Sequence, residues 1–138
     1  MEPFSGQCLC GAIRFEATPP SRFCAHCHCS MCRRAHGAPF VTWIGFRSEQ
    51  FRIVDGAEHL NRYQSSPEAT RSSCKRCGTM MLFESSRWAG EVHVARALIP
   101  GPVDKAPNAH CFYSDKADWV TVSDGLPLLG GPTGLEKL

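Results

Sequence analysis

The chain of 138 residues has little net charge and no long apolar run. Its formal net charge of +2 is too small to predict binding to nucleic acid or to an anionic membrane. No apolar stretch approaches the roughly 20 residues of a transmembrane helix, so we expect no membrane association. Residues 1–7 have neither the basic stretch nor the apolar core of a secretory signal, and we expect a cytoplasmic protein.

The sequence also lacks the patterns of several enzyme classes. No Ser/His/Asp arrangement, phosphate-binding glycine loop or pair of catalytic carboxylates stands out. Hydrophobic residues at 43% and charged residues at 20% are typical of a folded protein, and the length suits one domain. We place this domain at residues 1–128. The run Gly130-Gly-Pro-Thr-Gly134 predicts a loose tail over residues 129–138.

The cysteines are the strongest indication of a functional site in this sequence. Seven of the nine cysteines fall into three groups, namely Cys8 and Cys10, then Cys27, Cys29 and Cys32, and finally Cys74 and Cys77. Cysteines spaced in this way can direct several sulfurs toward one tetrahedral ion such as Zn²⁺. The two pairs together supply four sulfurs, which is enough for a closed structural site. The group of three, called the cysteine trio below, is one ligand short, which is typical of a catalytic metal.

Disulfide bonds are the alternative use of these cysteines. Nine is an odd number, so complete pairing would leave one thiol over. A bond between Cys8 and Cys10 would close a small, strained ring. Clustered cysteines in a reducing compartment are more often metal ligands or catalytic groups, and we therefore favour metal binding. A redox role for the Cys74–Cys77 pair is disfavoured, because no βαβ pattern surrounds it.

Short runs of alternating or β-branched residues predict a mainly β protein. Residues 30–36 are the one segment with a helical pattern, and Gly37 supplies its stop. The predicted strands lie at residues 11–17, 40–46, 51–54, 60–63, 80–83, 92–97 and 111–113.

Ordered motifs across most of the chain resemble one known family. They are Gly6-Gln-Cys-Leu-Cys-Gly-Ala-Ile-Arg-Phe15, Cys27-His-Cys-Ser-Met-Cys-Arg-Arg34, Gly37-Ala-Pro-Phe40, Tyr63-Gln-Ser-Ser-Pro67, Cys74-Lys-Arg-Cys-Gly-Thr79, Pro107-Asn-Ala-His110 and Asp124-Gly-Leu-Pro127. The sequence is identified as a member of the glutathione-dependent formaldehyde-activating enzyme family, whose domain is shared with centromere protein V. The resemblance implies a β-tent fold, in which antiparallel sheets lean together and zinc sites lie at sheet edges and loops.

The resemblance also implies a role for each cysteine group. Cys8, Cys10, Cys74 and Cys77 match the structural zinc ligands of the family, and Cys27, Cys29 and Cys32 match its catalytic zinc ligands. Glutathione would be the co-substrate, with its sulfur at the open position of the second zinc. Attack on formaldehyde would give S-(hydroxymethyl)glutathione, so the expected activity is that of a carbon–sulfur lyase. We expect the second zinc site to be partly empty in purified protein.

Several residues near the cysteine groups have two possible roles. Arg33 and Arg34 suit the carboxylates of glutathione, or they offset the charge of the zinc thiolates. His110 matches a family position that lines the pocket, and a buried hydrogen-bonded histidine explains it equally well. His28 is favoured as a neighbour of the metal rather than as a ligand. Cys24 and Cys111 read as small buried residues, although Cys24 could supply a fourth ligand to the trio.

The main alternative to an enzyme is a non-catalytic zinc and thiol binding protein, or carrier. Such a protein would hold glutathione and release it unchanged. The expected partners are a small-molecule thiol and an aldehyde. The sequence does not predict the oligomeric state.

Overall fold

The computed structural model of the protein describes residues 2–138. The backbone packs as two compact units, unit 1 with residues 2–23 and 44–105, and unit 2 with residues 24–43 and 106–138. Strand β4 (Val41–Arg47) begins in unit 2 and ends in unit 1. None of the helices in residues 2–138 has the length and apolar character needed to cross a bilayer.

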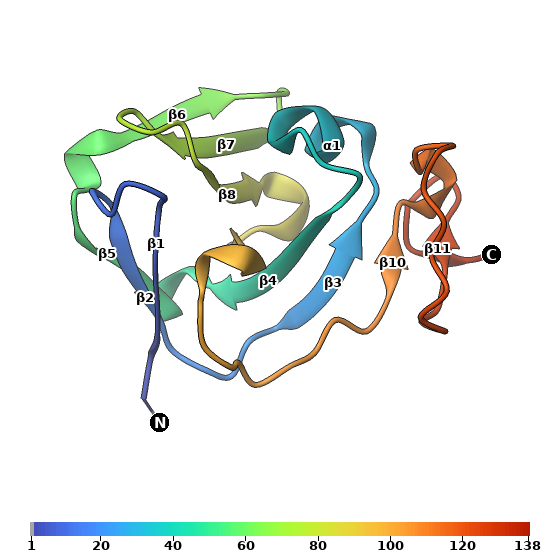
Figure 1. The fold of residues 1–138 in the computed structure, drawn as a ribbon, viewed down its shortest axis with the longest axis horizontal. Helices are drawn as coiled ribbons and strands as arrows, with labels where there is room; N and C mark the ends of the chain where they lie inside the picture. The colour runs from blue at the N-terminus through green and yellow to red at the C-terminus, as the bar shows by residue number, and fades with distance from the viewer. Residues whose placement is uncertain (1) are drawn as a thin grey trace. The chain divides into compact units, whose positions relative to one another are not determined.

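Unit 1 contains two sets of antiparallel strands (Figure 1). In the first set β2 lies between β1 and β5, with bounds β1 Phe4–Gln7, β2 Arg14–Ala17 and β5 Phe51–Asp55. In the second set each strand pairs with the next, with bounds β6 Leu60–Gln64, β7 Ala69–Cys74, β8 Met80–Ser85 and β9 Glu91–Ala95. Short 3₁₀ turns connect several of these strands, at Ser48–Gln50, Ala57–His59, Ser86–Trp88 and Arg96–Leu98.

The strands of unit 1 bury the apolar side chains that predicted them. In β2, Phe15 and Ala17 are buried and alternate with the charged Arg14 and Glu16, which is the pattern of a strand with one face in the core. Other buried apolar side chains of this unit are Ile13, Ile44, Phe46, Met81, Leu82, Val92, Val94 and Ile99. Burying such side chains supplies the main driving force for folding.

Unit 2 contains a parallel strand pair and one short helix. Strand β10 (His110–Cys111) lies parallel to β3 (Phe23–Cys27). Helix α1 (Ser30–His36) follows β3 and ends at Gly37, whose φ of +59° is left-handed and favours glycine. A 3₁₀ turn occupies Tyr113–Asp115.

The C-terminal residues 129–138, predicted as a loose tail, contain two short paired strands. These are β11 (Leu129–Gly130) and β12 (Glu136–Lys137), which run antiparallel. The single-domain boundary at residue 128 stays a prediction.

The mainly β fold class is confirmed, and most predicted elements appear. The helix lies at residues 30–36 as predicted. The predicted strand at residues 11–17 is shortened to its last four residues, because a turn occupies the preceding segment. The strand predicted at residues 111–113 is also shorter, since Tyr113 begins a 3₁₀ turn. Strands β1, β3 and β7 were missed.

Candidate functional site

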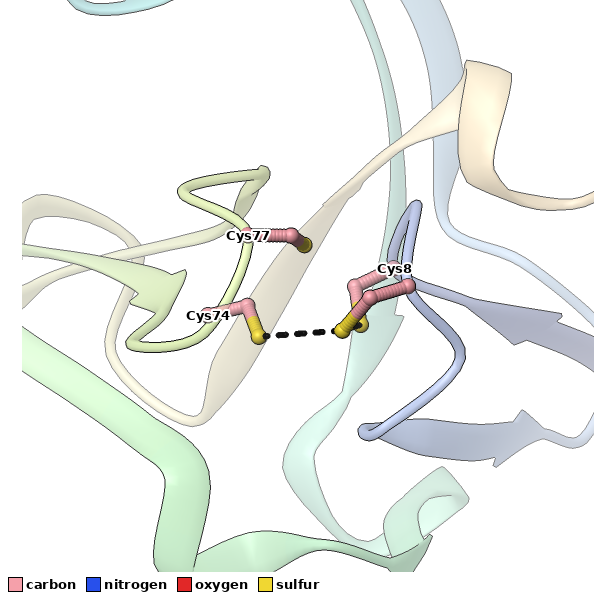
Figure 2. A group of neighbouring side chains, drawn as sticks. Cys8, Cys74 and Cys77 are labelled. Atoms are coloured by element: carbon pink, nitrogen blue, oxygen red, sulfur yellow. Dashed lines mark hydrogen bonds between the residues drawn. The ribbon is translucent and has the colours of Figure 1, made fainter.

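The two cysteine pairs of unit 1 meet at one point. Cys8 and Cys10 lie between β1 and β2. Cys74 ends β7, and Cys77 lies in the turn between β7 and β8; Figure 2 shows both beside Cys8. Their four sulfurs all lie within 4.8 Å of one another. Sulfur–sulfur distances are 3.7 Å for Cys8–Cys10 and 3.9 Å for Cys10–Cys74. Zn–S bonds of about 2.3 Å place tetrahedral sulfurs roughly 3.8 Å apart, so this group has the spacing of a zinc tetrathiolate.

Two glycines make these turns possible. Gly11 follows Cys10 with φ +78°, and Gly78 follows Cys77 with φ +80°. Each glycine N–H donates to the carbonyl of the first cysteine of its pair, at 3.1 Å to Cys8 and 2.8 Å to Cys74. A side chain would strain both turns, because L-residues rarely adopt this conformation.

Backbone N–H groups point at the sulfurs from outside the group. Ile13 N donates to Cys8 Sγ and Arg76 N donates to Cys74 Sγ, both at 3.3 Å. Leu9 N donates to Thr79 Oγ1 at 3.0 Å, which ties one turn to the other. Such contacts around a metal ligand orient it and stabilise its charged form.

Ionisation within this four-cysteine group is uneven. Hydrogen bonds from the side chain and backbone of Thr79 lower the pKa of Cys77 to about 5. Burial opposes ionisation of Cys8, but hydrogen bonds from Ile13, Cys10 and Cys74 outweigh it and lower the pKa of Cys8. A hydrogen bond from Ala12 favours the thiolate of Cys10, yet burial and the neighbouring sulfurs raise its pKa to about 11. A bound cation would remove this last penalty, because metal ligation deprotonates thiols.

The cysteine trio lies in unit 2, where β3 leads into α1. Cys27 ends β3, Cys29 precedes the helix, and Cys32 is its one buried residue. The Cys27 thiol donates to Cys32 Sγ at 3.6 Å, and Cys29 interacts with both. The structure therefore brings together the three cysteines that the sequence grouped.

The surroundings of the trio favour ionisation of Cys29 over that of Cys27, because they shift the two pKa values in opposite directions. Hydrogen bonds from Cys27 and Cys32, supported by the backbone of Cys32 and Met31, lower the pKa of Cys29 far below its ordinary value. The same sulfur contacts, together with burial, raise the pKa of Cys27. A half-exposed cysteine whose pKa is lowered can act as a nucleophile or as a metal ligand.

The two arginines after the trio differ in their surroundings. Arg33 donates from Nε to the His28 carbonyl at 3.3 Å and from NH2 to the Asp115 carbonyl at 2.9 Å. Arg34 is exposed, and no carboxylate among residues 2–138 forms an ion pair with it. Arg34 is therefore the more available of the two for an anionic group.

His110 is buried and hydrogen-bonded at both ring nitrogens. Its Nδ1 lies 2.8 Å from Nε2 of His28, and its Nε2 lies 2.8 Å from Oδ2 of Asp124. His28 is fully buried, and burial with the charges of His110 and other neighbours lowers its pKa to about 4. The His110 hydrogen bond lowers the pKa of Asp124.

Comparison with known proteins gives a family for this arrangement. The family model "Glutathione-dependent formaldehyde-activating enzyme" matches residues 3–115, a span that contains both cysteine groups. The chain belongs to this family.

Individual relatives cover most of the chain. A Halomonas elongata protein named "Putative glutathione-dependent formaldehyde-activating enzyme" is 30% identical over 125 residues, covering 85% of this chain and 79% of its own. An uncharacterized lyase of Schizosaccharomyces pombe is 30% identical over 118 residues, covering 86% and 84%. The crystal structure of a Rhodobacter sphaeroides protein is similar with a TM-score of 0.62 at 31% identity, covering 71% of this chain and 89% of that one.

The two remaining cysteines of this formaldehyde-activating family member lie in unit 2. Cys24 is buried in β3. Cys111 is half-buried, its pKa is raised by burial, and it is in register with Cys27. All nine cysteines are free thiols in the structure.

The sequence analysis did not single out His26, nor the contact of Asp124 with His110. One ligand atom each from His26, His110 and Asp124 lie within 4.8 Å of one another. The available signal was the spacing His26-x-His28, in which His26 belongs to β3 and His28 directly follows it. Asp124 lies in a segment without helix or strand, and no local pattern predicts what it contacts.

Proposed function

We propose that the protein is a zinc-dependent carbon–sulfur lyase/synthase that adds formaldehyde, or another small aldehyde, to glutathione or a related thiol. With formaldehyde and glutathione the product is S-(hydroxymethyl)glutathione. Membership of the family and the lyase relative support this proposal. The observation that carries it is the cysteine trio at the start of α1, in which the Cys27 and Cys32 sulfurs are 3.6 Å apart and hydrogen bonds from both lower the pKa of Cys29. A cytoplasmic location remains part of the proposal.

The donor sets of both cysteine groups fit zinc. Cys8, Cys10, Cys74 and Cys77 would hold a structural ion, and their sulfur spacing supports this assignment. Cys27, Cys29 and Cys32 would hold the second ion, with a position left for the substrate. When bound there, zinc would supply the stabilisation that keeps an incoming thiol deprotonated at neutral pH.

The reaction itself needs little from the chain beyond alignment. The glutathione sulfur bonds to the carbonyl carbon, the C=O electron pair moves to oxygen, and that oxygen takes the proton the thiol has lost. The reverse reaction breaks the carbon–sulfur bond and returns the aldehyde. Holding thiol and aldehyde side by side replaces a chance encounter with an oriented one. The exposed Arg34 guanidinium would bind a carboxylate of glutathione, while Arg33 fixes the backbone around the trio.

Exchange between free formaldehyde and its glutathione adduct, followed by NMR, tests the proposal. We expect exchange to accelerate in the presence of the zinc-loaded protein. Cys29→Ser should abolish the acceleration, and Cys111→Ser, which removes a thiol outside the trio, should retain it. Saturable glutathione binding without any acceleration would instead identify a carrier.

A further inference from the structure

The face of β3 opposite Cys27 carries a second cluster of ligating groups. Side chains alternate along an extended strand, so His26 points to the face of β3 opposite the neighbouring Cys27. His28 directly follows β3, and its ring lies 5.0 Å from that of His110. Strand β10 places His110 in register with His26, and the two rings lie 4.8 Å apart. Asp124 reaches the same cluster and hydrogen-bonds to His110. This cluster is therefore separate from both cysteine groups.

We propose that His26, His110 and Asp124 form a third metal site, which takes a divalent transition-metal ion of the zinc class. Two imidazole nitrogens and one carboxylate oxygen suit Zn²⁺, Fe²⁺, Co²⁺ or Ni²⁺ and differ in kind from a thiolate set. Three protein ligands leave positions for water or another small ligand. The site is independent of the proposed lyase activity.

The spacing of the three ligands is close to what such an ion requires. Metal–ligand bonds of about 2.0–2.2 Å hold tetrahedral ligands roughly 3.3–3.6 Å apart. The three ligand atoms lie within 4.8 Å of one another, and His110 Nε2 and Asp124 Oδ2 are 2.8 Å apart. This last pair must open slightly. Asp124 has the freedom to do so, because its side chain is 44% exposed.

Both imidazoles are already oriented through their other nitrogen. Nδ1 of His26 lies 2.8 Å from Oγ1 of Thr42, and Nδ1 of His110 lies 2.8 Å from Nε2 of His28. Histidines that bind metals are typically fixed in this way by a hydrogen bond on the second ring nitrogen. His28 is itself held between aromatic rings, with Phe40 at 5.0 Å. The arrangement leaves Nε2 of His26 for an ion, together with Nε2 of His110 once its contact with Asp124 opens.

Both histidines would bind the ion as neutral imidazoles through Nε2, with the ring proton on Nδ1, where it donates to Oγ1 of Thr42 from His26 and to Nε2 of His28 from His110. The Asp124 carboxylate would offset part of the charge of the ion. The ion would also tie Asp124 to β3 and β10. Residues 116–127, which include Asp124, form neither helix nor strand, so this link would order them.

Zinc titration of protein whose cysteine groups are already loaded with zinc tests the site. The readouts are calorimetry and the ¹⁵N resonances of the histidine rings, which distinguish ligation by imidazole from ligation by thiol. We expect a further equivalent of zinc to bind and to shift the ring nitrogens of His26 and His110. Failure of any further ion to shift these resonances would mean that the cluster is a hydrogen-bonded network only, and would overturn the proposal.

Two variants that each remove one proposed ligand, and one matched control variant, test the site further. Asp124→Ala and His26→Ala should each weaken binding of this ion at least tenfold. Asp118→Ala removes an exposed aspartate six residues away and should bind as the parent does. Parent-like affinity in either ligand variant would contradict the site. Because Asp124 is half-exposed, its replacement should leave the melting temperature of the metal-free protein close to that of the parent.

Discussion

Replacing Cys77 with serine removes one ligand from the four-cysteine group and should destabilise unit 1 strongly. The group joins two turns that are far apart in sequence, since Cys10 and Cys74 are separated by 64 residues. A metal ion held by both turns acts as a cross-link that closes this loop. The thermal stability should therefore depend on the ion much as a secreted domain depends on a disulfide.

The expected loss of stability can be estimated from the length of the loop that the ion closes. Closing a loop of about this length is worth roughly 4 kcal/mol in the chain-entropy treatment of cross-links. The entropy of unfolding is about 2.1 cal/mol/K per residue, or roughly 0.29 kcal/mol/K for this chain. Loss of the cross-link should then lower the melting temperature by about 15 °C. Ordinary domains are stable by only about 5–15 kcal/mol, so the variant would be largely unfolded under mild stress.

Thermal melting with and without a zinc chelator, together with zinc content per chain, measures this effect. Chelator should lower the melting temperature of the parent toward that of Cys77→Ser and should change the variant little. Cys111→Ser is the matched control, because it removes a thiol outside both groups. If Cys77→Ser keeps the zinc content and melting temperature of the parent, the assignment of the four-cysteine group is wrong.

Three further predictions concern single residues. Cys29→Ser should lose the second zinc and should no longer accelerate adduct formation. Its melting temperature should stay within a few degrees of that of the parent, because the trio is local in sequence. Zinc analysis and calorimetry measure both effects. Arg34→Ala should raise KM for glutathione about tenfold with little change in kcat, because one charge-assisted hydrogen bond to the substrate is lost. Steady-state kinetics with an unchanged KM would exclude this contact. Gly78→Ala should cost about 1–2 kcal/mol because φ is +80°. Gly101→Ala, at a position with normal φ and open space, should melt like the parent, and equal melting of both variants would contradict the argument.

The cysteine groups could be predicted because ligand spacing is a local property. Cys8 and Cys10 lie two residues apart and Cys74 and Cys77 three apart, so each pair shares one tight turn. Each pair is followed by a glycine that adopts the left-handed conformation. The count of sulfurs already combined the two pairs into one closed site, and the resemblance to the family implies the same assignment.

Elements without an apolar pattern were missed for a physical reason. Strand β7, with sequence Ala-Thr-Arg-Ser-Ser-Cys, buries Arg71 and Ser72 and has no alternation to detect. The guanidinium of Arg71 lies over the Phe83 ring at 4.8 Å, which is a tertiary contact. Strand β3 contains Cys27, and its sequence reads as part of a metal cluster rather than as a strand. The contact of Asp124 with His110 likewise depends on tertiary structure.

The most direct test of the proposed function is the pH dependence of formaldehyde addition to glutathione. A free thiol with a pKa of about 8.5 is only about 0.3% ionised at pH 6, so a protein that holds the thiolate can gain up to about 300-fold there and about 30-fold at pH 7. Zinc-loaded parent and Cys29→Ser prepared with zinc in the same way are compared at each pH by NMR exchange, relative to the spontaneous reaction.

The advantage of the parent over the spontaneous reaction should grow as pH falls from 8 to 6. It should disappear at lower pH, where the cysteine ligands themselves become protonated and the metal is lost. The Cys29→Ser variant should show no advantage at any pH. A parent rate equal to the spontaneous rate across the whole range would contradict the account.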